Sequence, residues 1–217
     1  MQKTAIILGA TGLTGSHLLK LLLEDETFSK VVVFTRRETG IKQPKLEEHI
    51  IDLLQLDNYK ELFKGDVVFC CIGTTKAKTP NKKAYKAIDY GIPVTAAKLA
   101  KQNNIDTYLV ISAMGASETS KVFYNKLKGE MEREVLAQKI AHTYLLQPSL
   151  IVGERSEKRG GEKFAEVIMR TFGFLIPEKY KMIQGKTIAK AMVEIAKNGY
   201  DKGVITSGEL QELGKTK

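Results

Sequence analysis

The feature that most constrains the fold lies near the N-terminus, where a glycine-containing segment separates an apolar run from a segment with helical spacing. The run AIIL ends at Leu8, GATGLTG follows, and leucines then recur three and four residues apart. A strand, a tight turn and a helix in this order leave free N–H groups of the helix N-terminus facing the turn, where they bind an anion. The stretch therefore predicts a phosphate-binding loop.

The loop carries glycines at three regularly spaced positions, Gly9, Gly12 and Gly15, a variant of the dinucleotide fingerprint with its second glycine moved by one place. Glycine allows a tight turn after the strand and leaves no side chain where a pyrophosphate approaches. Thr11 and Thr14 add hydroxyl donors. The alternative is that the segment is only a turn, so the phosphate interpretation depends on the rest of the chain.

Apolar runs typical of strands recur along the chain, separated by segments with helical spacing. We expect strands in AIILG, KVVVFT, EEHIID, DVVFCCIG, TYLVISA and HTYLLQP, and helices over residues 12–23, 82–102, 124–138 and 187–197. Parallel strands need crossover helices, so this order predicts an α/β fold with a Rossmann-type doubly wound parallel sheet. We expect residues 1–217 to form a single NAD(P)-binding domain, in which the loop-rich region 148–217 covers the substrate.

Charge and cysteine usage narrow the class of protein only partly. A formal net charge of +9 suits nucleic acid, an acidic membrane surface or a phosphorylated ligand, but no nucleic-acid motif favours the first. The adjacent Cys70 and Cys71 lie in an apolar run and indicate a reducing compartment. No apolar run reaches the roughly 18 residues of a membrane span, and no signal peptide is evident. We therefore expect a soluble cytoplasmic protein, and no metal site, because the three histidines lack ligand spacing.

The residues after the second predicted strand indicate which cofactor is bound. In nicotinamide-binding folds, an acidic residue there accepts hydrogen bonds from the 2′-hydroxyl of the adenosine ribose. This chain instead has Arg36 and Arg37, whose guanidinium groups donate charge-assisted bonds to a 2′-phosphate. The pair favours NADP(H), with two solvated loop arginines as the alternative. After the third strand, Asp52 and Leu53 lie where a carboxylate meets the adenine amino group, unless they are a solvated strand end.

The fourth predicted strand ends in Gly73, Thr74 and Thr75. Open parallel sheets bind ligands at the carboxyl edge of their strands, and a glycine there lets the backbone approach a ribose or nicotinamide. We therefore expect these three residues to contact the cofactor. The lysine-rich segment that follows is expected to be a solvated loop and helix start.

Candidate catalytic residues follow the fifth predicted strand, which ends with Ser112. Tyr124 and Lys128 lie four residues apart on a predicted helix, so both side chains share one helical face. An ammonium near a phenol favours the phenolate and lowers the pKa of the phenol. We predict that Ser112 holds a substrate oxygen, Tyr124 exchanges a proton with it, and Lys128 tunes Tyr124 and holds the nicotinamide ribose. Composition alone predicts about one such Tyr-Lys pair by chance, so the prediction depends on its position.

With GATGLTG, FTRR, CCIGTT, ISAMGAS and YNKLKGE in this order, the chain resembles an atypical short-chain dehydrogenase/reductase over roughly residues 3–153. Within that superfamily it is most similar to the HIV Tat-interacting protein oxidoreductase-like group, which is NAD(P)H-binding and NmrA-like. The resemblance implies a Rossmann-type sheet, a site of Ser112, Tyr124 and Lys128, and a segment QPSLIVGER that closes over the nicotinamide. The residues it implies for NADPH are Gly9, Thr11, Gly12, Leu13, Thr14, Gly15, Arg36 and Arg37.

These predictions describe an NADPH-dependent oxidoreductase that acts on a small carbonyl or alcohol. A second hypothesis is a non-catalytic NADPH-binding sensor or regulatory protein that acts through a protein partner. Turnover of NADPH with a panel of carbonyl compounds separates the two hypotheses.

Overall fold

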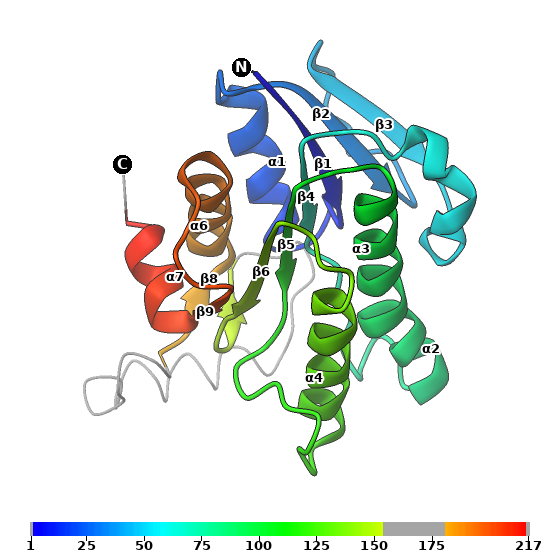
Figure 1. Ribbon diagram of the computed structural model, residues 1–217, viewed down its shortest axis with the longest axis vertical. Coiled ribbons are helices and arrows are strands. Elements are labelled where there is room, and N and C mark those ends of the chain that lie inside the picture. The colour runs from blue at the N-terminus through cyan, green and yellow to red at the C-terminus, as the bar shows by residue number, and fades with distance from the viewer. Residues whose placement is uncertain (1, 154–180, 216–217) are drawn as a thin grey trace.

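The computed structural model describes residues 2–153 and 181–215, and these form a seven-stranded sheet with the order β3-β2-β1-β4-β5-β6-β9 (Figure 1). Every paired neighbour in it is parallel. The order reverses between β1 and β4, so the predicted Rossmann-type sheet is confirmed. The strands are β1 (Lys3–Leu8), β2 (Phe28–Thr35), β3 (Leu46–Ile50), β4 (Val67–Cys70), β5 (Thr107–Ile111), β6 (His142–Gln147) and β9 (Val204–Thr206).

Helices cover both faces of the sheet, which explains why central strands such as VVFC are apolar and buried at every position. One face packs against α1 (Gly15–Glu24), α6 (Gly185–Asn198) and α7 (Ser207–Leu213). The other face packs against the 3₁₀ segment η1 (Leu53–Leu62), α3 (Ile92–Gln102) and α4 (Phe123–Leu136). Figure 1 shows these two layers on either side of the strands.

The helical connection between β4 and β5 is not a regular α-helix. The segment expected over residues 82–102 consists of α2 (Lys82–Lys86), a π-helical turn η2 (Ala87–Gly91) and then α3. Asp89 lies in the π turn and is only 1% exposed. Since π turns inserted into α-helices are frequent at functional sites, this one directs attention to Asp89.

The other expected helices are present, and additional short elements complete the sheet. The segments 12–23, 124–138 and 187–197 correspond to α1, α4 and α6. Strand β9 and helix α7 were not predicted, because a three-residue edge strand is too short to show a pattern. A separate small sheet pairs β7 (Ile151–Val152) with β8 (Ile183–Gln184). Part of the predicted covering region 148–217, residues 154–180, lies outside the described residues.

Candidate active site

The glycine loop joins β1 to α1 where the strand order reverses. Gly9 has a φ of +86°, and a Cβ there would lie 2.8 Å from the carbonyl oxygen of Cys71. A Cβ on Gly15 would collide with the Gly9 carbonyl oxygen, so this glycine lets α1 begin directly against the loop. A Cβ on Gly12 would meet only the Gly9 oxygen, at 3.2 Å, and Cys71, at 4.0 Å. The loop is therefore a cradle whose open side is free of side chains, which fits a pyrophosphate.

The remaining loop residues point in different directions. Thr11 is exposed, whereas Thr14 is buried, so only the Thr11 hydroxyl faces open space beside the loop. Leu13 packs against two glycines of the C-terminal part of the chain. A Cβ on Gly153 would lie 2.8 Å from Leu13 Cδ1, and one on Gly185 would lie 2.9 Å from the Leu13 carbonyl oxygen. Leu13 thus anchors the loop to the start of α6.

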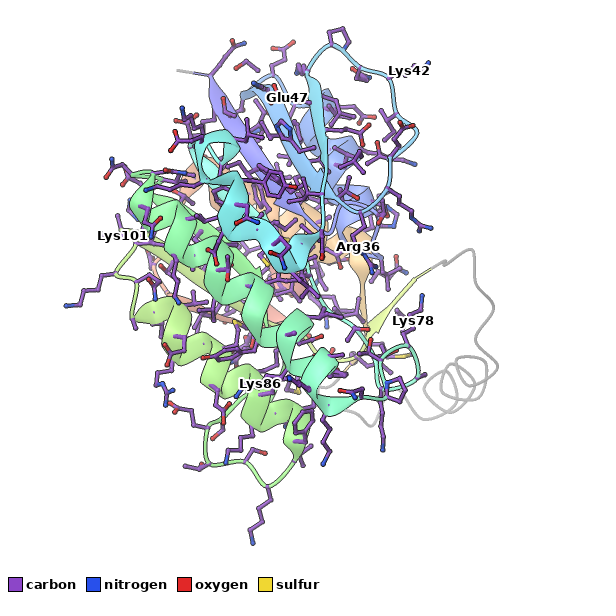
Figure 2. All side chains as sticks on the ribbon, turned by 90° about the vertical axis from the view of Figure 1, so that its right-hand side faces the viewer. Arg36, Lys42, Glu47, Lys78, Lys86 and Lys101 are labelled. Atoms are coloured by element: carbon purple, nitrogen blue, oxygen red, sulfur yellow. The ribbon has the colours of Figure 1, made fainter. Side chains whose placement is uncertain are left out.

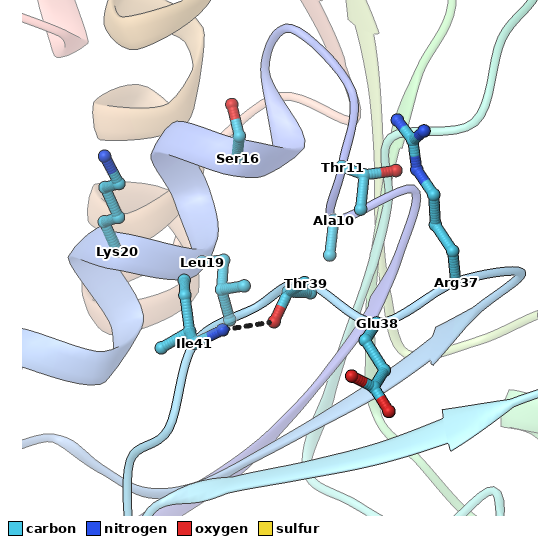
Figure 3. A pocket seen from close by; sticks show the side chains of 9 residues that line it. All are labelled: Ala10, Thr11, Ser16, Leu19, Lys20, Arg37, Glu38, Thr39 and Ile41. Atoms are coloured by element: carbon cyan, nitrogen blue, oxygen red, sulfur yellow. Dashed lines mark hydrogen bonds between the residues drawn. The ribbon is translucent and has the colours of Figure 1, made fainter.

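A cavity of about 500 Å³ lies between α1 and the segment that follows β2 (Figure 3). Arg37 and Lys20 bring positive charge to its lining, and Ser16 adds a hydroxyl. In Figure 3 the Arg37 guanidinium lies beside Thr11, whereas the Glu38 carboxylate points the opposite way. The lining is therefore suited to a phosphate. It consists of Ala10, Thr11, Ser16, Leu19, Lys20, Arg37, Glu38, Thr39 and Ile41.

Arg36 lines a second cavity, of about 410 Å³, together with Asp52 and Tyr59. The two adjacent arginines thus reach different cavities, Arg37 the first and Arg36 the second. Asp52 also accepts a hydrogen bond from the backbone N–H of Leu54, at 3.0 Å, and so begins η1. Leu53, the other residue predicted here, has its side chain buried in the core and does not line the cavity.

The predicted catalytic side chains lie around the carboxyl end of β5. Ser112 is 3% exposed, and its Oγ has no hydrogen-bond partner among residues 2–153 and 181–215. Lys128 Nζ donates to the carbonyl oxygen of Ile111 at 3.3 Å and lies 6.0 Å from the centre of the Tyr124 ring. A buried hydroxyl without a partner is costly, and an incoming ligand oxygen would relieve that cost. This arrangement fits a site that receives a polar oxygen.

Asp89 joins this group, and sequence reasoning did not identify it. Its Oδ1 lies 3.3 Å from Lys128 Nζ, and its Oδ2 accepts from the backbone N–H of Thr74 at 2.7 Å. The available signal was an acidic residue on the apolar face of a helix, four residues after the buried Tyr85 and three before the buried Ile92. A buried ion pair thus links η2, α4 and the segment after β4.

The pKa of the Tyr124 phenol differs from the sequence prediction. Burial and the Asp89 carboxylate raise the pKa of Tyr124 to about 12. The pKa of Tyr124 is therefore raised and not lowered as the sequence predicted, first because the phenol is withdrawn from water and second because of the Asp89 carboxylate. Burial raises the pKa of Asp89 as well, opposed by Lys128 and by the N–H of Thr74. Tyr124 therefore keeps its proton at neutral pH.

The segment after β4 is held in place by its neighbours. Besides its bond to Asp89, Thr74 lies 2.9 Å from Thr79, Oγ1 to Oγ1, and its carbonyl oxygen accepts from the Tyr85 hydroxyl at 3.2 Å. Thr75 begins a turn in which its carbonyl oxygen accepts two backbone N–H groups. Gly73 is exposed at the carboxyl edge of the sheet, and a Cβ there would lie 3.6 Å from Asp89 Oδ1.

Comparison with known proteins agrees with this geometry. Residues 9–152 match a family model described as NAD(P)H-binding. Protein FMP52, mitochondrial, from Candida albicans is 31% identical over 218 residues, with 95% of each chain covered. Protein HTATIP2 from Rattus norvegicus is 31% identical over 199 residues, covering 88% of this chain and 80% of that one. The Bordetella bronchiseptica enzyme WbmH in complex with NAD+ has the same fold, with a TM-score of 0.70 at 18% identity over 95% of this chain and 76% of that one.

The expectation of a cytoplasmic location is wrong, since the fungal relatives are named mitochondrial. Two cysteines in an apolar run indicate only reducing surroundings and cannot distinguish one reducing compartment from another. Among the described parts of the chain, no helix has the length and apolar character needed to cross a membrane.

Proposed function

Because the chain belongs to the NAD(P)H-binding family and is an atypical short-chain dehydrogenase/reductase, we propose that it uses NADPH to reduce a small carbonyl compound. The observation that carries this proposal is the grouping of Ser112, Tyr124 and Lys128 at the end of β5, two strands from the glycine cradle. Both lie at the carboxyl edge, where open parallel sheets bind ligands.

We assign the cofactor-holding roles from the two cavities and the cradle. The open side of Gly12 would receive the pyrophosphate beside the N-terminus of α1, where the helix dipole favours an anion. Arg37 and Lys20 hold the 2′-phosphate in the larger cavity, since two cations there match a dianion. Arg36 and Asp52, which line the second cavity, would hold the adenine, with the Asp52 carboxylate accepting from its amino group.

The residues at the end of β5 supply the proton side of the reaction. The bound cofactor supplies a hydride to the carbonyl carbon, so the carbonyl oxygen must receive a proton. The Ser112 hydroxyl, which is free of protein partners among the described residues, donates a hydrogen bond to that oxygen and positions it. Tyr124, protonated at neutral pH, transfers its proton to the same oxygen. Lys128, whose Nζ lies 6.0 Å from the centre of the Tyr124 ring, donates to the carbonyl oxygen of Ile111 and so holds the backbone directly before Ser112.

Replacement of the proton donor tests this function. Tyr124→Phe keeps the ring that packs edge-on against Tyr85 and removes only the hydroxyl, so we expect an unchanged fold and unchanged NADPH affinity. Turnover on the best substrate from a panel of aldehydes, ketones and quinones should fall about a hundredfold or more, the scale of a lost general acid. Tyr200→Phe, which removes a hydroxyl after α6, is the matched control and should keep full activity.

Two results would contradict the proposal. Full turnover in Tyr124→Phe would show that the proton comes from elsewhere. Firm NADPH binding with no reduction of any carbonyl on a broad panel would favour the second hypothesis, a sensor that acts through a protein partner.

A further inference from the structure

Asp89 is a charged group in this site to which the reaction above gives no role. It is 1% exposed, its partner Lys128 is 2% exposed, and they come from different helical segments, η2 and α4. Removing either member would leave an uncompensated charge in the interior, and a buried charge without a partner strongly destabilises a protein. The π turn that brings Asp89 inward is also an irregularity that a purely structural helix does not need.

The Asp89–Lys128 ion pair holds two backbone segments of the site in place. The Asp89 carboxylate holds the N–H of Thr74, so it ties down the segment after β4 that is expected to meet the cofactor. Lys128 also donates to the carbonyl oxygen of Ile111, directly before Ser112. One ion pair therefore connects the positions of Thr74, Ser112 and Tyr124.

Two further titratable groups of the described residues interact with the ion pair or the phenol: Cys70 of β4, with Lys128 and Asp89, and Tyr85 of α2, with Asp89 and Tyr124. Lys86 of α2 and Glu130 of α4 form a separate ion pair, with Nζ 3.6 Å from Oε2, which carries no net charge. Asp89 is thus the anion that balances Lys128.

We propose that Asp89 is a positioning residue that holds the Lys128 ammonium at the end of β5, compensates its charge, and so commits Tyr124 to the role of proton donor. This inference rests on the proposed reductase function and adds which direction of the reaction, carbonyl reduction or alcohol oxidation, the site favours. Reduction of a carbonyl needs the protonated phenol, whereas oxidation of an alcohol needs the phenolate. Because the Asp89 carboxylate compensates the positive charge of Lys128, the site favours carbonyl reduction at neutral pH. It becomes able to oxidise alcohols only at strongly alkaline pH.

Direct titration of Tyr124 tests this role without any substrate. Tyrosine labelled with carbon-13 at Cζ reports each phenol by NMR, and Tyr124→Phe identifies the resonance. In the wild-type protein we expect the Tyr124 signal to titrate above the ordinary tyrosine value of about 10. In Asp89→Asn, which keeps an oxygen for Thr74 and removes the charge, the midpoint should fall by at least one pH unit. Glu130→Gln, which removes a charge from a half-buried carboxylate of α4, should leave the midpoint unchanged.

The pH profile of reduction gives a second reading of the same group. Activity that requires the protonated phenol is present below its pKa and is lost as the pH rises through it. The wild-type protein should therefore keep a flat kcat/KM for reduction up to about pH 10. In Asp89→Asn, kcat/KM for reduction should already fall below about pH 10. Asp89→Glu restores the charge, so its kcat/KM should again stay flat up to that pH.

The outcomes separate this inference from the proposed function. If no carbonyl is reduced, the proposed function fails, but the NMR titration still decides the role of Asp89. A wild-type Tyr124 signal that titrates at or below the ordinary tyrosine value overturns the inference even if Asp89→Asn does not fold. An unchanged midpoint in a folded Asp89→Asn overturns it equally, because the carboxylate would then not control the phenol.

Discussion

Two buried serines of this protein differ in what their hydroxyls contact. Ser207 is 0% exposed and donates to Ser149 Oγ at 3.0 Å, whereas the Ser112 Oγ has no partner within the described residues. We therefore expect Ser207→Ala to lower the free energy of unfolding by about 1 kcal/mol, the net value of a hydrogen bond, and Ser112→Ala to leave it unchanged or raise it. Turnover should fall only in Ser112→Ala. Chemical denaturation together with carbonyl turnover checks both.

The separation of Arg36 and Arg37 makes cofactor choice a property of one residue. Arg37→Ala should weaken NADPH binding by about 1.5 to 3 kcal/mol, the range for a charge-assisted contact, and leave NADH binding unchanged. Arg36→Ala should weaken both cofactors alike, because adenine is common to them. Figure 2 shows Lys42 at the outer end of the same connection, away from Arg36, and Lys42→Ala is the charge-matched control. Equal wild-type affinities for NADPH and NADH would refute the assignment.

The glycine loop shows how one element serves both packing and binding. A Cβ on Gly15 meets the Gly9 backbone, so Gly15→Ala should destabilise the fold itself. Gly12→Val projects into the open side of the cradle, so the protein should stay folded and lose about 3 kcal/mol of NADPH binding, roughly two charge-assisted hydrogen bonds. Gly208→Val, where nothing lies within 4 Å, should change neither property. Melting temperatures and calorimetric titration separate the cases, and intact NADPH binding in Gly12→Val would make the loop only a turn.

Regular elements are predictable from this sequence, and irregular ones are not. The strands before Gly9 and Ser112 are continuous apolar runs, which any strand covered on both faces must be. The π turn around Asp89 adds one residue to a helical turn without changing the apolar pattern, so the sequence predicted one regular helix there. The pKa of Tyr124 was predicted in the wrong direction because both causes of its rise, first the burial of the phenol and then the nearby Asp89 carboxylate, depend on the fold.

The sheet as a whole explains why distant residues share one site. All of its paired strands are parallel, so the segments after β1, β2, β4 and β5 emerge at the same edge (Figure 1). Gly9, Arg37, Thr74 and Ser112 are therefore gathered along one edge despite their separation in sequence. The C-terminal part reaches this edge as well, through the contacts of Gly153 and Gly185 with Leu13. The topology was predictable from the order of elements, but this last contact was not, since it joins residues without a shared pattern.

The most direct measurement of the central claim follows the hydride itself. NADPH carrying deuterium at the reactive nicotinamide carbon is incubated with the protein and a panel of aldehydes and ketones, and the alcohols formed are analysed by mass spectrometry. We predict one deuterium on the carbinol carbon of at least one product with the wild-type protein, and about a hundredfold less with Tyr124→Phe. Deuterium that remains entirely on tightly bound NADPH with every carbonyl offered would contradict a reductase.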